Sequence, residues 1–325
     1  MVVAISLRKK MKIVVLEAGV MTPGGLSLDV YKQFGEVILY HTTKQDQVIE
    51  RIGDADIILL NKLIIDKTVM SACTNLKYIG LFATGFNTID IEYAKSHGIT
   101  VCNAGSYSTN AVAQHTLALI LNHFNQISNY HNAVQNGVWE KSELTTLYDF
   151  PTDEVYGKTI GIIGYGHIGQ RVAKLARAFD MKVIVHTRTP KPDGDAEFVS
   201  FDELLSRSDI ISLHCPLTDE SRLMLNADAF NKCKKGALLV NTARGGLVDE
   251  PALRDAVLSG QLSGAALDAI TVEPMRNCIL KGVDNIVITP HAAWAPMSTR
   301  IKLLGITVDC IKGWLEGNTI NVVSK

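Results

Sequence analysis

Three polar side chains in the second half of the chain follow apolar runs and have the chemistry of an acid–base site. They are Arg244 in the segment NTARG, Glu273 in the segment DAITVEP and His291 in the segment TPH. An imidazole transfers protons near neutral pH, and a neighbouring carboxylate favours its charged form and fixes its orientation. A guanidinium group matches a carboxylate bidentately. A lone His or Arg would be interpreted as structural, but the three together predict acid–base chemistry on a carboxylate-bearing substrate.

A glycine-rich segment earlier in the chain has the pattern of a dinucleotide-binding turn. It reads GYGHIG, follows the apolar run Thr159–Ile163 and opens an amphipathic stretch, which is the strand–turn–helix context that this pattern requires. Its three glycines permit, in order, a tight turn, close approach of the backbone to a pyrophosphate, and helix–strand packing. The alternative is a glycine-rich turn without a ligand. The expected cofactor contacts are Gly164, Gly166, His167, Ile168 and Gly169.

The end of the next apolar run bears on the choice between NAD and NADP. An acidic residue about twenty residues after the glycines would bind the ribose hydroxyls of NAD. Here the run ends at Thr187 and Arg188, with no Asp or Glu. Arg188 suits a 2′-phosphate, which favours NADP(H) slightly over NAD(H). Alternatively, Arg188 stacks on the adenine or points to water.

Bulk composition excludes several other classes of protein. The chain has 325 residues, 47% hydrophobic and 20% charged, with a net charge of -1. This length predicts two domains, and the charge balance argues against a nucleic-acid partner. Six scattered cysteines without a C-x-x-C pair indicate reduced thiols and no metal site. No apolar run approaches a membrane span, so we expect a cytoplasmic protein without a membrane partner.

Two series of short apolar runs must position these side chains. A frayed extension is expected before Met11, where the ordered structure should start. The first series begins at Lys12, and the second begins at Thr159. Runs alternating with helical stretches predict parallel sheets covered on both faces. A long helix is expected from Ser108 to Gln126, capped by Ser108 or Thr109, at a domain junction. We expect residues 137–153 to form a loop and residues 297–315 a final helix.

The order and spacing of four motifs closely resemble the D-isomer-specific 2-hydroxyacid dehydrogenase family. The motifs are GYGHIG, NTARG, the acidic pair Asp268 and Glu273, and TPH. The resemblance implies an α/β fold of two doubly wound parallel-sheet domains. A Rossmann dinucleotide-binding domain of residues 104–291 would be inserted into a flavodoxin-like substrate domain of residues 11–103 and 292–325. It also implies NAD(P)-dependent reduction of a small 2-oxo acid to the D-2-hydroxy acid, usually by a homodimer.

The resemblance also assigns roles to the site residues of the second half. Arg244 would bind the substrate carboxylate and carbonyl, His291 would be the acid/base, and Glu273 would hold its imidazole. Asp268 would meet the nicotinamide carboxamide. Two further cofactor contacts are expected, at Thr242 and Ala243. The other histidines, including His115 and His123 on the long helix, are interpreted as packing or helix-surface residues.

Two loops of the first half resemble the substrate-binding part of the family. Thr84 and Gly85 lie in the segment ATGFN, whose backbone N–H groups would hold the carboxylate. Alternatively, this segment is a simple turn. Asn61 and Lys62 follow the preceding apolar run and would line the pocket, or form a solvated loop.

Trp294 and the ATGFN segment resemble the glycerate dehydrogenase or hydroxypyruvate reductase branch. An indole over the pocket favours short substrates, with hydroxypyruvate first and glyoxylate second. One alternative is a sibling enzyme that acts on another 2-oxo acid. A second, from a different class, is a dinucleotide-sensing binding protein similar to transcriptional corepressors.

Overall fold

The computed structural model describes residues 10–190 and 196–324. Most of the expected N-terminal extension, residues 1–9, lies outside the described residues, and the first strand begins at Met11 as expected. The chain divides into two compact units. Unit 1 consists of Met1–Tyr107 and Pro296–Lys325, as far as these are described, and unit 2 is Ser108–Ala295. Which ligand each unit binds stays a prediction at this point.

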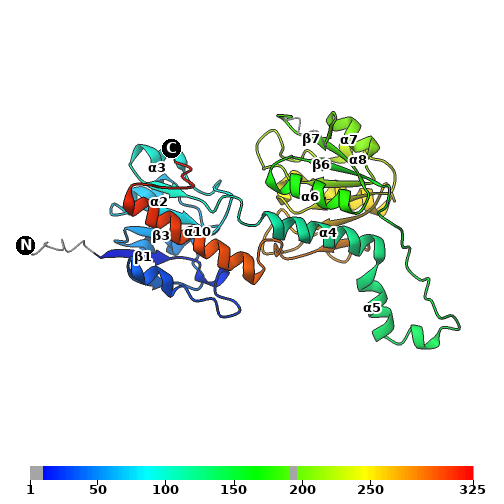
Figure 1. The fold of residues 1–325 in the computed structure, drawn as a ribbon, viewed down its shortest axis with the longest axis horizontal. Helices are drawn as coiled ribbons and strands as arrows, with labels where there is room; N and C mark the ends of the chain where they lie inside the picture. The colour runs from blue at the N-terminus through cyan, green and yellow to red at the C-terminus, as the bar shows by residue number, and fades with distance from the viewer. Residues whose placement is uncertain (1–9, 191–195, 325) are drawn as a thin grey trace, which may run out of the picture. The chain divides into compact units, whose positions relative to one another are not determined.

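Unit 1 is built on a parallel sheet of five strands in the order β2-β1-β3-β4-β5 (Figure 1). This is the strand order of flavodoxin-like folds, in which the order reverses beside the first strand. The strands are β1 Met11–Val15, β2 Gly35–Leu39, β3 Ile57–Leu60, β4 Tyr78–Leu81 and β5 Thr100–Cys102. The helices are α1 Val48–Ile52, α2 Lys67–Ala72, α3 Ile91–Ser96 and α10 Met297–Glu316, with 3-10 turns η1 Ala18–Val20, η2 Asp29–Gln33 and η3 Gln45–Gln47.

Helices cover both faces of this sheet, so its central strands are buried on both sides. Helices α1, α2 and α3 pack on one face in a single apolar cluster, whereas α10 lies on the other face. There the Trp314 ring lies 5.0 Å from the Tyr78 ring, and the hydroxyls of Thr307 and Tyr31 are 2.6 Å apart. Burial on both faces explains why strands β3 and β4 are continuous apolar runs in the sequence.

Unit 2 contains a parallel sheet of seven strands in the order β12-β11-β10-β9-β6-β7-β8. This is the Rossmann arrangement, in which the order reverses between β6 and β9. The strands are β6 Thr159–Ile163, β7 Lys182–His186, β8 Glu197–Phe198, β9 Ile210–Leu213, β10 Ala237–Asn241, β11 Leu262–Leu267 and β12 Ile286–Ile288. The sequence predicted six of these strands. It missed β8, which has two residues and no apolar run.

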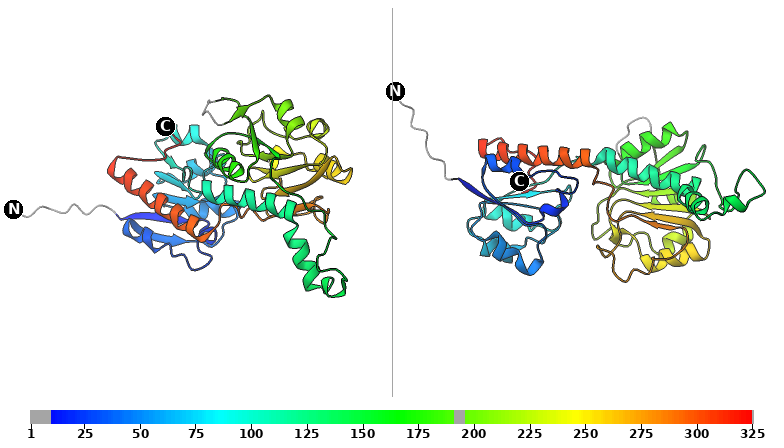
Figure 2. Two further views of the ribbon diagram at one scale, coloured as in Figure 1. Left: turned by 45° about the vertical axis from the view of Figure 1, so that its right-hand side comes forward. Right: turned by 90° about the horizontal axis from the view of Figure 1, so that it is seen from below.

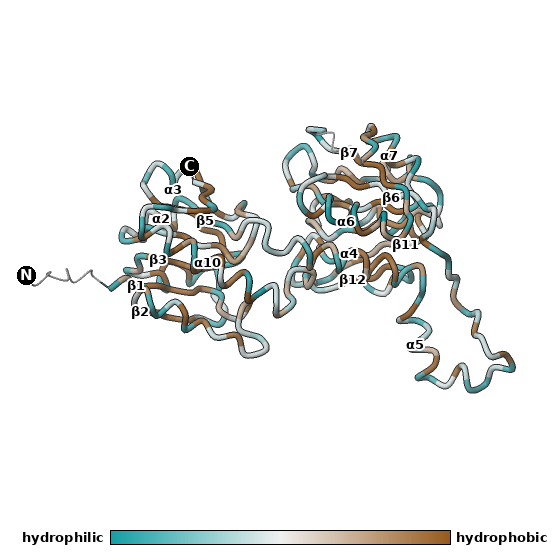
Figure 3. The backbone as a smooth tube through the Cα atoms, in the orientation of Figure 1, coloured by the Kyte–Doolittle hydropathy of each residue, from teal (hydrophilic) through white to brown (hydrophobic). Residues whose placement is uncertain are grey.

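The described residues of unit 2 form six helices, and five of them cover its sheet. Helices α4 and α6 share an apolar cluster on one face, and α7, α8 and α9 share a cluster on the other. In Figure 3 much of the strand backbone of unit 2 has the hydrophobic colour. The helices are α4 Thr109–Asn125, α5 Ile127–Gln135, α6 His167–Ala178, α7 Phe201–Arg207, α8 Ala227–Lys232 and α9 Glu250–Leu258, with 3-10 turns η4 Trp139–Lys141 and η5 Gly245–Leu247.

Helix α4 was predicted closely, but its start differs in one respect. Ser108 is the N-cap residue, yet its side chain makes no capping hydrogen bond. In contrast, Ser200, Asn226 and Asp249 each accept a hydrogen bond from the third residue of α7, α8 and α9. Short helices with such caps are the ones that most need them, because a one- or two-turn helix is marginal by itself.

Helix α5 and the chain after it extend away from the rest of unit 2 (Figure 2). The segment 137–153 is mainly irregular, as expected, and contains the single 3-10 turn η4. Helix α5 was not predicted. Six large apolar side chains of residues 127–148 are exposed, and the four most exposed are Ile127, Trp139, Leu144 and Tyr148, at 61%, 48%, 62% and 76%. Within the described residues, no helix is both long enough and apolar enough to cross a membrane.

Candidate active site

The glycine-rich turn follows β6, at the point where the strand order of unit 2 reverses. Gly164 has a φ of 95°, and a Cβ there would lie 2.6 Å from the backbone nitrogen of Cys215. A Cβ on Gly169 would lie 2.2 Å from the carbonyl oxygen of Gly164. Both positions therefore require glycine, one for the turn and one for helix–strand packing.

Gly166 is different, because it faces open space. Apart from its chain neighbours, no residue of the described ranges has an atom within 4 Å of the position that its Cβ would occupy, and Gly166 is the N-cap of α6 without a capping side chain. His167 and Ile168, exposed and half-buried, begin that helix. The first-turn N–H groups and the helix dipole fit a pyrophosphate, and the missing side chain leaves room for it.

Thr187 and Arg188 follow β7 directly. Thr187 is half-buried and Arg188 is exposed. A hydrogen bond from Thr218 is the main cause that lowers the pKa of Glu220, and the positive charge of Arg188 contributes to the same shift. Arg188 therefore lies within electrostatic range of an acidic side chain. This proximity reduces the net positive potential that the guanidinium group offers to a ligand.

Arg244 stands at the carboxyl end of β10 in a turn fixed by the buried Asn241. The Oδ1 of Asn241 accepts from the Ala243 N–H at 3.0 Å, and its Nδ2 donates to the Arg244 carbonyl at 2.9 Å. The Arg244 side chain is exposed and donates from Nη1 to the Ala243 carbonyl at 2.7 Å. Thr242 is anchored through its Oγ1, 3.0 Å from the Oγ1 of Thr116 on α4. The turn is thus rigid while its guanidinium group faces solvent.

His291 and Glu273 meet directly, as the sequence predicted. The Nδ1 of His291 lies 2.8 Å from Oε2 and 3.0 Å from Oε1 of Glu273. Both side chains are about a quarter exposed, at 26% and 21%. Because Nδ1 faces the carboxylate, Nε2 is the ring nitrogen that can exchange a proton with a ligand.

Asp268, at the end of β11, holds the turn that carries His291. Its Oδ1 accepts from the Thr289 hydroxyl at 2.6 Å and from the Ala292 N–H at 2.8 Å, and its Oδ2 accepts from the Ala293 N–H at 2.9 Å. Its backbone carbonyl accepts from the His291 N–H at 3.0 Å. His291 has a φ of 53°, a left-handed conformation that a non-glycine residue adopts only when its surroundings impose it. The half-buried Trp294 follows directly after this turn.

His115 does not fit its interpretation as a packing or helix-surface residue. Its Nε2 lies 3.0 Å from the Oγ1 of Thr289 and 3.5 Å from the Oδ1 of Asp268. The sequence could not reveal this contact, since a helix alone does not show which of its faces meets a strand end 174 residues later. His123 on the same helix keeps a packing role. Its Nε2 lies 3.0 Å from the Oγ of Ser263, and burial lowers its pKa.

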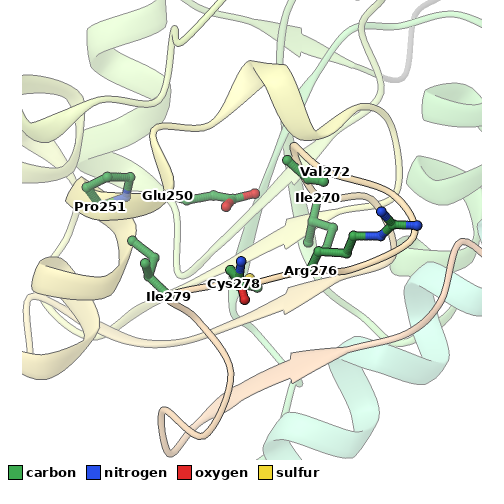
Figure 4. Close-up of a pocket in the computed structure, with 8 residues that line it drawn as sticks. Glu250, Pro251, Ile270, Val272, Arg276, Cys278 and Ile279 are labelled. Carbon is green, nitrogen blue, oxygen red and sulfur yellow. The ribbon is translucent and has the colours of Figure 1, made fainter.

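Glu250, a residue that the sequence analysis missed, accepts a hydrogen bond from the loop that carries Glu273. The Oε1 of Glu250 accepts from the Thr271 N–H at 2.7 Å. A Cβ on Gly245 would lie 2.0 Å from the carbonyl carbon of Ile270, so the Arg244 turn packs directly on this loop. A small cavity of about 240 Å³ lies here, lined in part by Glu250, Ile270, Val272, Arg276 and Cys278 (Figure 4).

In unit 1, the predicted substrate residues lie at the carboxyl ends of β3 and β4. Glu17, missed in the sequence analysis, accepts from the Asn61 and Lys62 N–H groups at 2.6 and 2.8 Å. Its position directly after β1, at the same sheet edge, is the signal that would have found it. Asn61 donates from Nδ2 to the Phe82 carbonyl at 2.8 Å, which ties the two loops together.

The ATGFN loop is held by hydrogen bonds between Thr84 and the chain after β5. The Thr84 Oγ1 donates to the Gly105 carbonyl at 2.5 Å, and Asn103 donates to the Thr84 carbonyl at 2.7 Å. Within residues 10–190 and 196–324, the backbone N–H groups of Thr84 and Gly85 have no acceptor. N–H groups without an acceptor in the chain suit a carboxylate ligand.

Known proteins resemble this chain over most of its length. Residues 117–293 match the family model "D-isomer specific 2-hydroxyacid dehydrogenase, NAD binding domain". The chain belongs to this family. It is 39% identical to a hydroxypyruvate reductase of Blautia hydrogenotrophica over 97% of this chain and 100% of the relative. It is 38% identical to a glycerate dehydrogenase of Methylorubrum extorquens over 87% of this chain and 90% of the relative.

A solved structure of an acyclic imino acid reductase (Bsp5), in complex with NADPH and D-Arg, has a TM-score of 0.86 at 31% identity. It covers 96% of this chain and 100% of the other. The predicted family and fold are therefore confirmed. This D-2-hydroxyacid dehydrogenase is an NAD(P)-dependent oxidoreductase that acts on 2-oxo acids.

Proposed function

We propose that this enzyme reduces hydroxypyruvate to D-glycerate, with glyoxylate as a poorer substrate. The observation that carries the proposal is the His291–Glu273 pair on the loops after β11 and β12, with Arg244 on the loop after β10, all at the carboxyl edge of the unit 2 sheet. Two relatives over most of the chain, named hydroxypyruvate reductase and glycerate dehydrogenase, support this substrate. Trp294, immediately after the His291 turn, supports a short substrate, because an indole fills space that a branched side chain would need.

Each site residue has a proposed task. The bound nicotinamide supplies the hydride. His291 donates a proton from Nε2 to the oxygen on which charge develops, while Glu273 stabilises the resulting ring orientation and charge. Arg244 uses its exposed guanidinium group to bind the substrate carboxylate and polarise the carbonyl. Among the described residues, the Oδ2 of Asp268 accepts one hydrogen bond, so this oxygen would remain able to accept from the nicotinamide carboxamide.

The unit 1 loops have a proposed task in carboxylate binding. The N–H groups of Thr84 and Gly85 bind the substrate carboxylate, and Asn61 and Lys62 add a polar wall. Support comes from these N–H groups, which have no acceptor among the described residues, and from Glu17, which fixes the Asn61–Lys62 backbone. In water such contacts would be weak, but they gain strength when solvent is excluded.

For the cofactor we propose that NADPH is used at least as well as NADH. The phosphates bind Gly164–Gly169 and the first turn of α6, and Thr242 and Ala243 line the path to the nicotinamide. Arg188 and Thr187 take the 2′-phosphate position, and the described residues 187–190 at the end of β7 include no acidic side chain. The nearby Glu220 limits this preference, since it partly offsets the charge of Arg188.

We also propose that the enzyme is a homodimer. The support is the exposed apolar group of Ile127, Trp139, Leu144 and Tyr148, because so many large apolar side chains on one extended segment are unusual for a monomer. Light scattering after gel filtration measures the mass directly, and a monomeric mass at micromolar concentration would contradict the proposal.

The decisive experiment is substrate profiling with the purified enzyme. The ratio kcat/KM is measured for hydroxypyruvate, glyoxylate, pyruvate and 2-oxoisocaproate, each with NADH and NADPH. We expect hydroxypyruvate to give the highest value and D-glycerate to be the product. If pyruvate or the branched oxo acid wins by about tenfold, or about 1.4 kcal/mol of transition-state preference, the substrate assignment is wrong.

A further inference from the structure

Two histidines of α4 make similar contacts, but only one of them reaches the catalytic turn. His115 and His123 each place Nε2 3.0 Å from a hydroxyl oxygen, of Thr289 and Ser263 respectively. Ser263 lies within β11, away from its carboxyl end. Thr289 is two residues before His291 and donates to Asp268. His123 is therefore a matched control for His115 on the same helix.

The direction of the hydrogen bonds follows from the single proton of a hydroxyl group. The Thr289 hydroxyl gives its proton to the Oδ1 of Asp268 at 2.6 Å. Its oxygen must therefore accept from His115, so the Nε2 of His115 carries a proton. The result is a chain of two hydrogen bonds in one direction, from His115 through Thr289 to Asp268. Successive bonds in such a chain polarise and strengthen one another.

The end of this chain is the residue that shapes the His291 turn. Asp268 is 3% exposed, and its carboxylate and carbonyl accept from the N–H groups of Ala293, Ala292 and His291. A buried carboxylate without enough donors is costly, so the turn depends on the donors that Asp268 keeps. Thr289 is one of these donors, and His115 fixes the rotamer that lets Thr289 donate.

We propose that His115 is a positioning residue for the acid–base histidine, acting through Thr289 and Asp268. This inference rests on the proposed function in one respect, namely that His291 is the acid–base group. His115 touches neither the substrate nor the hydride, and it supports the left-handed conformation of His291 through three successive hydrogen bonds, to Thr289, to Asp268 and to the His291 N–H. A misplacement of about 1 Å at a reacting group lowers turnover by up to about a hundredfold, so loss of this chain should reduce kcat.

The test compares three variants with the wild-type enzyme. His115→Phe keeps an aromatic ring and removes the donor, His115→Gln keeps an N–H donor, and His123→Phe is the matched control on the same helix. For each we measure kcat and KM with saturating cofactor, the cofactor Kd by fluorescence, and Tm. The substrate is whichever 2-oxo acid the wild type reduces best, so a different substrate ranking would overturn the proposed function and leave this inference standing.

We expect His115→Phe to lower kcat about tenfold or more, with KM and the cofactor Kd changed by no more than about twofold. His115→Gln should regain most of the lost turnover. His123→Phe should keep kcat near the wild-type value even if its Tm falls. Equal kcat for the His115→Phe and His123→Phe enzymes would overturn the proposal, as would a loss confined to cofactor affinity.

A second comparison covers the case in which His115→Phe does not fold. Thr289→Val interrupts the same chain, and Thr289→Ser preserves its hydroxyl. We expect a low kcat for the valine variant and a near-normal kcat for the serine variant. Where all variants fold, the effects of His115→Phe and Thr289→Val should be strongly non-additive, because both break one chain. Additive effects would contradict transmission through Thr289.

Discussion

The carboxylate of Glu273 straddles one nitrogen of His291, with its two oxygens 2.8 and 3.0 Å from Nδ1. This contact fixes the ring orientation from the protein side and assigns the exchangeable proton to the other nitrogen, Nε2. The Ile270 N–H donates to Oε1 of the same carboxylate at 3.3 Å, so Glu273 itself is held. The pair is therefore a preorganised acid–base unit.

Removal of the His291 imidazole should abolish most turnover without unfolding the enzyme. We expect His291→Ala to lower kcat by about 10²–10⁴-fold, the usual contribution of a general acid. Cofactor binding, measured by fluorescence titration, should stay close to that of the wild type, since the phosphate-binding turn lies at a different strand end. Near-normal turnover in a folded His291→Ala enzyme would remove His291 from the mechanism.

Glu273→Gln should have a smaller effect than His291→Ala. An amide oxygen can still accept from the Nδ1–H, but the amide carries no charge to stabilise an imidazolium. We expect kcat to fall to a value between those of the wild type and His291→Ala, with KM little changed. Glu250→Ala, which removes the acceptor for the Thr271 N–H, is the comparison for general loosening of the same loop. A kcat equal to that of the wild type would show that Glu273 has no catalytic effect.

The strands of this enzyme were largely predictable because parallel sheets are buried on both faces. Strands such as β3 and β10 are therefore continuous apolar runs, bounded by turn residues. The same logic fails for β8, which is too short to form a run, and for α5, whose residues ISNYHNAVQ are mostly polar. Their structure depends on neighbouring segments rather than on local pattern.

The site was predictable where a residue type and its strand end coincide. Arg244, Glu273 and His291 follow late strands, so the sequence alone placed them at one sheet edge. His115 and Glu17 escaped prediction for a different reason. Their partners lie 174 and 44 residues away, and such pairings arise only when the sheet and its helices have formed.

The cofactor preference should respond to Arg188. We expect Arg188→Ala to raise KM for NADPH several-fold and to change KM for NADH little, because only NADPH carries the 2′-phosphate. Glu220→Gln should act in the opposite direction, since it removes a negative charge near Arg188. Steady-state kinetics with both cofactors measure this directly. A strong NADH preference that Arg188→Ala leaves untouched would refute the proposed NADPH use.

His214 should make the stability of unit 2 pH-dependent. Burial lowers the pKa of His214 to about 3, whereas an unfolded histidine titrates near 6.5. Below pH 6.5 the unfolded chain therefore binds a proton that the folded chain does not. The free energy of unfolding should be insensitive to this group above pH 6.5 and fall as the pH decreases toward 3.

His214→Gln tests this dependence, because glutamine does not titrate and can still bond to the Ser212 hydroxyl, which lies 2.8 Å from the Nε2 of His214. Tm is measured for both proteins between about pH 7 and pH 5. We expect the wild type to lose more Tm than the variant over this window. Parallel Tm curves for the two proteins would exclude His214 as a source of the pH dependence.

The last prediction concerns Trp294 and the size of the substrate. Trp294 is half-buried beside the Asp268-held turn, so its indole has limited freedom and can set a steric limit for the substrate side chain. We expect Trp294→Ala to raise kcat/KM for 2-oxoisocaproate relative to hydroxypyruvate by about tenfold or more, since a deleted indole leaves space that a branched chain fills. Trp139→Ala is the control, because Trp139 is exposed on the extended segment of unit 2. The ratio of the two kcat/KM values is insensitive to the fraction of active enzyme, which separates specificity from stability. An unchanged ratio in Trp294→Ala would mean that the indole does not limit substrate size, and the preference for short 2-oxo acids would then require another wall of the pocket.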